Sequence, residues 1–290
     1  MSEARAIPVV IRSHNDLSYL KDTLAMVFAQ SLAASVHVFD NDSSDGTLDY
    51  LASQNVTVHR VPEGTYIPGD VLNRAMQTMD PSQPFVAFLN SDCTPLDEHW
   101  LEYLLASFSE GVAAVFGRQV PRPDCKPLFA KDTEDTFGDG ERQKTWKHCF
   151  SMASSAIRRS VWESMPFRTD ITYSEDIDWT WRARQEGWKI SYTKDSRVYH
   201  SHNYTPSQFY KRHQGEGRAE AHIFTWKAWE RSFLRYSLLP FLRQIKSDYI
   251  YAIQKGHPSL FVRSPILRLS QLRGRRKGFL QGLKEIIHEQ

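Results

Sequence analysis

Short apolar runs alternate with helical stripes from Ile7 to Phe116, and no other feature constrains the fold as strongly. The stripes repeat every three or four residues, as at Leu17, Leu20 and Leu24. The apolar runs are Ile7–Ile11, Val36–Phe39, Val56–Val58, Phe85–Leu89 and Val112–Phe116. Such alternation predicts right-handed βαβ units, and therefore an α/β fold with a mostly parallel, Rossmann-like sheet flanked by helices.

After Gly117 the alternation stops. Prolines and polar residues dominate 121–147, a stretch that contains Trp146, and we expect it to form an irregular loop or lid beside a binding site. A helix is predicted from about Arg158 to Ser164, another opening at Ser174, and a strand at 189–192. Beyond residue 206 the pattern is helical. We therefore expect one domain over 1–205 and a helical extension over 206–290.

Ligands of parallel sheets bind at the carboxyl ends of the strands, where this chain places polar motifs. One is Asp40 to Thr47, sequence DNDSSDGT. A calcium loop is excluded, because its glycine is one place late and Leu51 occupies the bidentate position. Two interpretations remain: a turn with an Asp or Ser cap, or Asp40 accepting a hydrogen bond from a nucleotide base.

Asp92 follows the apolar run Phe85–Leu89 in the motif Asn90-Ser91-Asp92. A carboxylate buried there without a partner would be costly. Mg²⁺ or Mn²⁺ bridging a diphosphate would supply that partner, since these ions are held by one or two carboxylates plus phosphate oxygens. The alternative is a carboxylate that only caps the following turn.

Three acids stand in four residues at Glu175, Asp176 and Asp178, where a helix is expected to begin. Acids in a first turn complement the helix dipole, and Ser174 would cap it, so a structural role is one interpretation. The other makes Asp176 a general base, with Trp179 as a flat platform for an acceptor sugar.

His200 and His202 occupy alternate positions at the end of a predicted strand. Alternate residues of a strand point the same way, which suits metal binding, although a pair of histidines can equally be polar surface. Arg118, after the fifth strand, is interpreted either as a contact to phosphate or acceptor, or as a surface arginine covering apolar area.

Charge and cysteine content exclude several classes of protein. The net charge of +2 gives no global reason to expect nucleic acid, and the three cysteines form no CxxC pair. The N-terminus runs into a strand without an apolar leader, and no apolar stretch of spanning length follows, so we expect a cytoplasmic protein.

The order of these motifs resembles that of family 2 glycosyltransferases with the GT-A fold, in particular the rhamnosyltransferase-like branch. The resemblance extends over about residues 7–215. Val10–Asn15 matches the family's first-strand loop, and Asp40–Thr47 matches its DNxSxDGT turn. Asn90–Asp92 matches its variant DxD motif, and Glu175–Trp179 matches its ED-x-x-W motif. Further matches are Tyr66–Asn73, Ala114–Gln119, Ala156–Glu163 and His200–Thr205. The departure is Asn90, which stands where the motif has its first acid.

The resemblance implies an inverting, metal-dependent transfer from a dTDP- or UDP-linked sugar, such as rhamnose, to an acceptor hydroxyl in bacterial glycan synthesis. It implies a nucleotide half over about 1–117 and an acceptor half over 118–205. It implies that Asp176 is the general base and that Asp92 and His200 are Mn²⁺ or Mg²⁺ ligands, with His202 as the second choice of histidine. The nucleotide contacts that it implies are Ser13, Asp40, Gly69, Asn73, Ser91 and Asp92. The implied acceptor contacts are Glu175 and Trp179. The acceptor is expected to be a glycan, lipid-linked or small molecule, and a homo-oligomer is compatible with the sequence.

Residues 263–290 carry seven Lys and Arg against two Glu, interleaved with leucine and phenylalanine. This segment is interpreted either as a peripheral contact with the inner face of a membrane, or as a helix packed on the domain with a solvated basic face.

Two other functions fit parts of the sequence. A nucleotidyltransferase making nucleotide sugars should have a glycine-rich loop after the first strand, whereas the first glycine here is Gly46. A noncatalytic glycosyltransferase-like binding subunit is favoured by Asn90 and opposed by Asp92 and Asp176.

Overall fold

The computed structural model describes residues 5–141 and 148–289. It divides into two compact units, the first made of Met1–Arg122, Thr133–Asp170 and Glu175–Ser201. The second unit comprises Pro123–Asp132, Ile171–Ser174 and His202–Gln290. Trp146, expected in a lid over the site, lies outside the described residues. The division of the first domain into nucleotide and acceptor halves stays a prediction.

An eight-stranded sheet forms the first unit, in the order β3-β2-β1-β4-β7-β6-β8-β5. The strands are β1 (Ile7–Ser13), β2 (Ala34–Asp40), β3 (Thr57–Arg60), β4 (Phe85–Asn90), β5 (Thr94–Pro95), β6 (Val112–Val120), β7 (Ser154–Arg158) and β8 (Lys189–Tyr199). The four strands β3, β2, β1 and β4 run parallel, as do β6 and β8, whereas β7 and β5 are antiparallel to their neighbours. The predicted mostly parallel sheet is confirmed.

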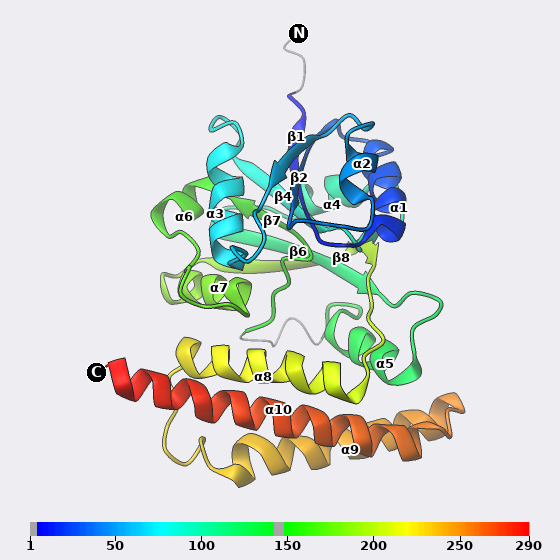
Figure 1. Cartoon of the computed structure of the whole chain (residues 1–290), viewed down its shortest axis with the longest axis vertical. Coiled ribbons are helices and arrows are strands. Elements are labelled where there is room, and N and C mark those ends of the chain that lie inside the picture. The colour runs from blue at the N-terminus through cyan, green and yellow to red at the C-terminus, as the bar shows by residue number, and fades with distance from the viewer. Residues whose placement is uncertain (1–4, 142–147, 290) are drawn as a thin grey trace. The chain divides into compact units, whose positions relative to one another are not determined.

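Helices cover both faces of this sheet because successive strand side chains point to opposite sides. Val9 and Ile11 of β1 pack in the core with α1, α2 and α4, whereas Val10 packs in a second core with α3, α6 and α7. Figure 1 shows α3 and α6 on one side of the sheet and α1 and α2 on the other. These helices are α1 (Leu17–Phe28), α2 (Thr47–Leu51), α3 (Pro68–Thr78), α4 (Trp100–Ala106), α6 (Arg159–Ser164) and α7 (Glu175–Gln185).

Strand β7 was not predicted, although it lies in the middle of the sheet. Its sequence begins with Ser154 and Ser155, which weaken the apolar signal of a central strand. Both serines are fully buried, and Ser154 Oγ accepts a hydrogen bond from the indole of Trp100 at 2.9 Å. A polar residue is tolerated inside this sheet because its partner lies within reach.

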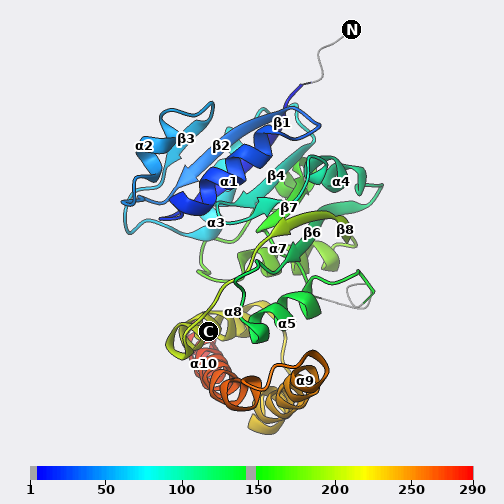
Figure 2. The same cartoon turned by 90° about the vertical axis from the view of Figure 1, so that its right-hand side faces the viewer.

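The second unit is helical, as predicted from the sequence. It contains the start of α5 (Pro127–Thr136), then α8 (Pro206–Ile223), a π-helical turn at Leu234–Leu238, α9 (Leu239–Lys255) and α10 (Leu260–Glu289). Thr205 begins α8 with a capping box to Gln208. Helices α8 and α10 approach closely at glycines, since a Cβ on Gly278 would lie 1.9 Å from the carbonyl oxygen of Gln214. Figure 2 shows α8, α9 and α10 nearly end-on.

Three charged groups, Lys131, Asp248 and Arg268, are buried together in the second unit, beside the partly exposed Asp132. Arg268 donates to Asp248 through Nε at 2.8 Å and also binds Asp132, and Lys131 Nζ lies 3.2 Å from Asp248. Asp248 and Arg268 are almost fully buried, so each charge depends on its partners. Among the described residues no helix is long and apolar enough to span a bilayer.

Candidate functional site

Ser13 and Asp40 end the neighbouring strands β1 and β2 and face each other in register. Asp40 is fully buried, and its two oxygens accept hydrogen bonds from the backbone N–H and the hydroxyl of Ser43, at 2.8 and 2.7 Å. The turn interpretation accounts for these bonds, and a contact to a nucleotide base stays a prediction. The buried Ser13 hydroxyl has no hydrogen-bond partner among the described residues, so it is available to a ligand.

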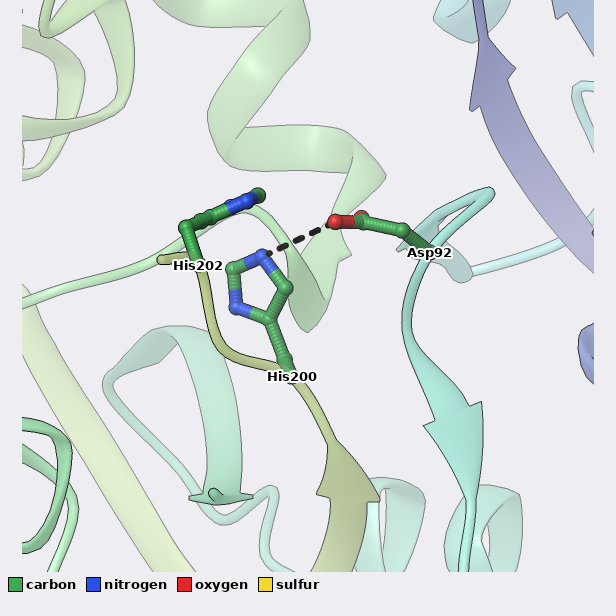
Figure 3. Close-up of side chains that lie close together, drawn as sticks. All are labelled: Asp92, His200 and His202. Carbon is green, nitrogen blue, oxygen red and sulfur yellow. Dashed lines mark ion pairs between the residues drawn. The ribbon is translucent and has the colours of Figure 1, made fainter. Parts of the chain in front are cut away.

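Asp92 and His200 meet at the ends of β4 and β8. His200 Nε2 lies 3.5 Å from Asp92 Oδ2, as the dashed line in Figure 3 marks. The other ring nitrogen, Nδ1, is 2.6 Å from Gln119 Oε1, and the Gln119 amide donates in turn to Ser151 Oγ at 2.8 Å. Because Gln119 Oε1 accepts from Nδ1, Nδ1 carries a proton, and Nε2 is the ring nitrogen that faces the carboxylate.

These donors fit a divalent cation. Ligand atoms of Asp92, His200 and His202 all lie within 4.8 Å of one another. Carboxylate and imidazole together suit Mn²⁺, and a ligating histidine usually donates its other N–H to a fixed acceptor, as His200 does to Gln119. The pairing of Asp92 with a histidine is therefore a geometry that can hold the predicted ion.

Arg12 connects the motif at the end of β4 to the start of α7. Its guanidinium donates to Asn90 Oδ1 at 2.9 Å and to Glu175 Oε1 at 3.1 Å. Both side chains of the Arg12–Glu175 ion pair are largely buried. Asn90 thus serves as an acceptor for Arg12, and the carboxylate of Glu175 is held by this ion pair. A direct contact between Glu175 and an acceptor stays a prediction.

Asp176 is held by the backbone at the first turn of α7. Oδ2 accepts from the N–H of Met152 at 3.0 Å, and Oδ1 accepts from the N–H of Ile177 at 2.8 Å. Burial raises the pKa of Asp176 to about 6, and the neighbouring Glu175 carboxylate contributes to the rise. A carboxylate with this pKa is largely ionised at neutral pH and is more basic than an exposed aspartate, which suits a general base.

Two of the predicted contact residues, Trp179 and Asn73, have partners in the core. Trp179 is fully buried, packs against Phe167 and donates its indole N–H to the carbonyl oxygen of Met165, so it offers no platform to a sugar. The Asn73 amide donates to the Phe167 carbonyl and accepts from the Phe167 N–H and the Trp162 indole. The expectation that Trp179 touches an acceptor is therefore wrong, because the side chain is fully buried. Asn73 is half-buried and braces the Phe167 backbone, and its contact with a nucleotide stays a prediction.

Gly69 is required for close packing in the first turn of α3. A Cβ there would lie 1.9 Å from the carbonyl oxygen of Arg168, which is backbone and cannot swing aside. We expect Gly69→Ala to destabilise the fold by about 1–3 kcal/mol, measured by urea unfolding. An unchanged unfolding midpoint together with weaker nucleotide binding would instead support the predicted nucleotide contact.

Ser91 and Arg118 remain candidates with different surroundings. The Ser91 hydroxyl donates to Asp16 at 2.7 Å and its backbone N–H donates to the Arg12 carbonyl, so both donors have partners within the protein. Arg118 Nε is buried and has no hydrogen-bond partner among the described residues. A nucleotide contact for Ser91 and a phosphate or acceptor contact for Arg118 stay predictions.

Sequence reasoning missed Gln119 and Arg122. Arg122 donates to the backbone carbonyl of Asp92 and to that of Ser201, and its guanidinium lies over the Tyr19 ring, 4.1 Å from the centroid. Because the positively charged guanidinium of Arg122 is bonded to the Asp92 backbone, it is placed to meet an anionic ligand. Gln119 lies within the predicted match to Ala114–Gln119, but nothing in the sequence shows which histidine it contacts.

The family model described as glycosyl transferase family 2 matches residues 9–165. The O-antigen chain rhamnosyltransferase WbaN of Salmonella anatum is 30% identical over 62% of this chain and 60% of WbaN. The O-antigen chain rhamnosyltransferase RfbN of Salmonella typhimurium is 27% identical over 73% of this chain and 71% of RfbN. The match to WbaN thus spans less than two thirds of that relative.

Two solved structures share the fold. The mannosyltransferase PcManGT from Pyrobaculum calidifontis, in complex with GDP-Man and Mn²⁺, aligns with a TM-score of 0.66 at 14% identity, over 98% of this chain and 88% of that one. Glucosyl-3-phosphoglycerate synthase from Mycobacterium tuberculosis, with Mn²⁺, UDP and phosphoglyceric acid, gives 0.55 at 17% identity, over 78% and 81%. The predicted GT-A type of α/β fold is confirmed.

Proposed function

Because the chain belongs to glycosyl transferase family 2, as the order of its motifs predicted, we propose that it transfers a sugar from a nucleoside-diphosphate sugar to an acceptor hydroxyl with inversion at the anomeric carbon. The observation that carries the proposal is Asp92 facing His200 Nε2 at the end of β4, where parallel sheets bind their ligands. The elevated pKa of Asp176 at the start of α7 supports it.

Asp176 acts as the general base. The acceptor hydroxyl gives its proton to the carboxylate as its oxygen attacks the anomeric carbon, and the bond to the diphosphate oxygen breaks. The N–H groups of Met152 and Ile177 fix the carboxylate, so little reorganisation is needed when it accepts the proton. A single displacement of this kind inverts the anomeric configuration.

Asp92 and His200 would hold the divalent cation, with His202 as a further donor within reach. An ion bound there supplies charge neutralisation for the leaving diphosphate. Arg122 adds a positive charge beside the Asp92 backbone. The hydroxyl of Ser13 and the carboxylate of Asp40 hold the nucleoside, because they lie together at the ends of β1 and β2.

The names of the relatives support a deoxysugar donor and a role in O-antigen or similar glycan assembly. The donor of this proposal is dTDP- or UDP-linked, with rhamnose as the first candidate. We favour glycan and lipid-linked acceptors over free small molecules, because both relatives are named O-antigen chain rhamnosyltransferases. We propose that the protein acts at the cytoplasmic side of the membrane, which its C-terminal helices contact peripherally.

The test is nucleotide release. Purified protein is incubated with dTDP-, UDP- and GDP-sugars in Mn²⁺ or in EDTA, and free nucleoside diphosphate is measured. We expect release from one donor, slowly to water and faster with acceptor, and loss of release in EDTA. Tight nucleotide binding without release from any donor would contradict the proposal and favour the noncatalytic alternative.

A further inference from the structure

The outward face of α9 is aliphatic where a solvated helix face is normally polar. Its exposed side chains recur at helical spacing, and four of these eight are large aliphatics: Leu239, Leu242, Arg243, Lys246, Ile250, Ile253, Gln254 and Lys255. Ile253 is 72% exposed. On the opposite face, Asp248 and Ala252 are buried in the second unit.

The first half of α10 repeats the pattern. Val262 is 69% and Ile266 is 53% exposed, and Leu269 and Arg273 continue the same stripe one and two turns on. The two helices are joined where α9 ends and α10 begins, because the rings of Tyr249 and Phe261 pack with centroids 4.9 Å apart. Apart from Leu280 and Ile287 near the end of α10, the exposed aliphatics of both helices therefore belong to one hairpin, formed by α9 and the first half of α10.

The charge of this hairpin has a single sign. Residues 239–282 contain nine Lys and Arg and one acid, Asp248. That acid is buried and is neutralised by Arg268 and Lys131, so no carboxylate of the segment reaches its surface. The exposed Arg243, Lys246 and Arg263 lie among the aliphatic side chains.

The surface differs from the one expected from the sequence of residues 263–290. Leu267 and Phe279, which contributed to the apolar side of that segment, lie in the cores of the second unit. Much of the segment is thus a packed helix, as its alternative interpretation held. Of the segment's exposed aliphatics, Ile266 and Leu269 lie in the first half of α10 and continue the stripe of α9, whereas Leu280 and Ile287 lie farther along the helix.

We propose that these exposed side chains of α9 and α10, the hairpin face, dock on the surface of a bilayer that contains anionic lipid. Aliphatic side chains enter the boundary between headgroups and acyl chains, while Lys and Arg meet lipid phosphates. A second copy of the same face is disfavoured, since two faces without acids repel each other. Nucleic acid would not use the aliphatic side chains at the centre of the face.

The inference deepens the proposed function, on which its biological meaning rests, because docking would bring the transferase to a lipid-linked acceptor. Binding to vesicles does not require catalysis. A failure of docking can therefore be distinguished from a failure of the transferase proposal, which nucleotide release tests.

The experiment is flotation of the full chain with phosphatidylcholine vesicles, with and without phosphatidylglycerol. We expect binding only to the anionic vesicles, weakened by salt, and at least about tenfold weaker for Ile253→Glu with Val262→Glu. Lys246→Gln should weaken binding by about fivefold, as expected for the loss of one interfacial charge. Phe28→Glu, at an exposed residue of α1, is the matched control and should bind like the wild type.

Three results would overturn the inference. One is no flotation with anionic vesicles at low salt. Another is flotation that the double variant leaves unchanged while its thermal unfolding is normal. The third is a wild-type dimer in light scattering that the double variant converts to a monomer, which would assign the hairpin face to self-association.

Discussion

Replacement of Asp176 by asparagine should lower kcat/KM for sugar transfer by about 10²–10⁴, the usual contribution of a positioned general base. Asparagine keeps the size of the side chain and one oxygen for the backbone N–H groups of Met152 and Ile177, but it cannot accept the proton of the acceptor hydroxyl. The measurement is steady-state transfer with saturating Mn²⁺. Asp195→Asn, at an exposed position of β8, is the matched control and should retain full activity.

The pH dependence of the wild type follows from the same residue. Because the pKa of Asp176 is raised to about 6, the base is ionised at pH 7 and becomes protonated as the pH falls below about 6. We expect kcat/KM to fall about tenfold per pH unit below this value. An acidic limb nearer pH 4, or activity in Asp176→Asn equal to that of the control, would assign the base to another group.

Stability should move in the opposite direction to activity. A carboxyl whose folded pKa lies above its unfolded value of 3.8 binds more protons in the native state, so the wild type loses stability as pH rises from about 4 to 6. The neutral asparagine escapes this loss. The stability of Asp176→Asn relative to wild type should therefore increase between pH 4 and pH 7, measured by thermal unfolding at both pH values.

Arg268→Ala is expected to cost about 3–5 kcal/mol of folding free energy, because it leaves the buried carboxylate of Asp248 without its main partner. Burial alone would raise the pKa of Asp248, but hydrogen bonds and charge from Arg268 hold it below its ordinary value. Stability from this carboxylate is present at neutral pH and is lost as pH falls through the acid range. The measurement is equilibrium unfolding in urea at pH 7.

Two comparisons make the result specific. Arg197→Ala breaks an exposed ion pair with Asp97 and should cost at most about 1 kcal/mol. The double replacement Arg268→Met with Asp248→Leu removes both charges and should cost less than Arg268→Ala alone. A loss below about 1 kcal/mol for Arg268→Ala would mean that Lys131 alone neutralises Asp248.

The strand–helix order of residues 7–116 could be predicted because each strand is a separate apolar run and each helix has its own stripe. The positions of Asp40, Asp92 and Asp176 followed, since strand ends and helix starts locate them. Strand β7 could not be predicted, because Ser154 and Ser155 are polar in sequence; Ser154 is satisfied by the distant Trp100, whereas Ser155 donates to the nearby carbonyl oxygen of Met152.

Side-chain roles were harder to predict than positions. Trp179 follows the predicted base by one helical turn, but only the packing of Phe167 shows that it points into the core. The Arg12 bridge from Asn90 to Glu175 joins residues far apart in sequence, so no spacing indicates it. It also gives Asn90 a place in the site that does not depend on metal binding.

The central claim is the proposal that Asp92 and His200 would hold a cation, which would neutralise the diphosphate of a bound nucleotide. The most direct measurement is thermal unfolding with dTDP, UDP or GDP, each with and without Mn²⁺, on wild type, Asp92→Asn and the control Asp195→Asn. Ligand at about a hundred times its Kd should stabilise the protein by about 2.7 kcal/mol. We predict that one nucleotide stabilises wild type and control only with Mn²⁺, and that Asp92→Asn loses this effect. Equal stabilisation of Asp92→Asn, or none of the wild type, would contradict the account.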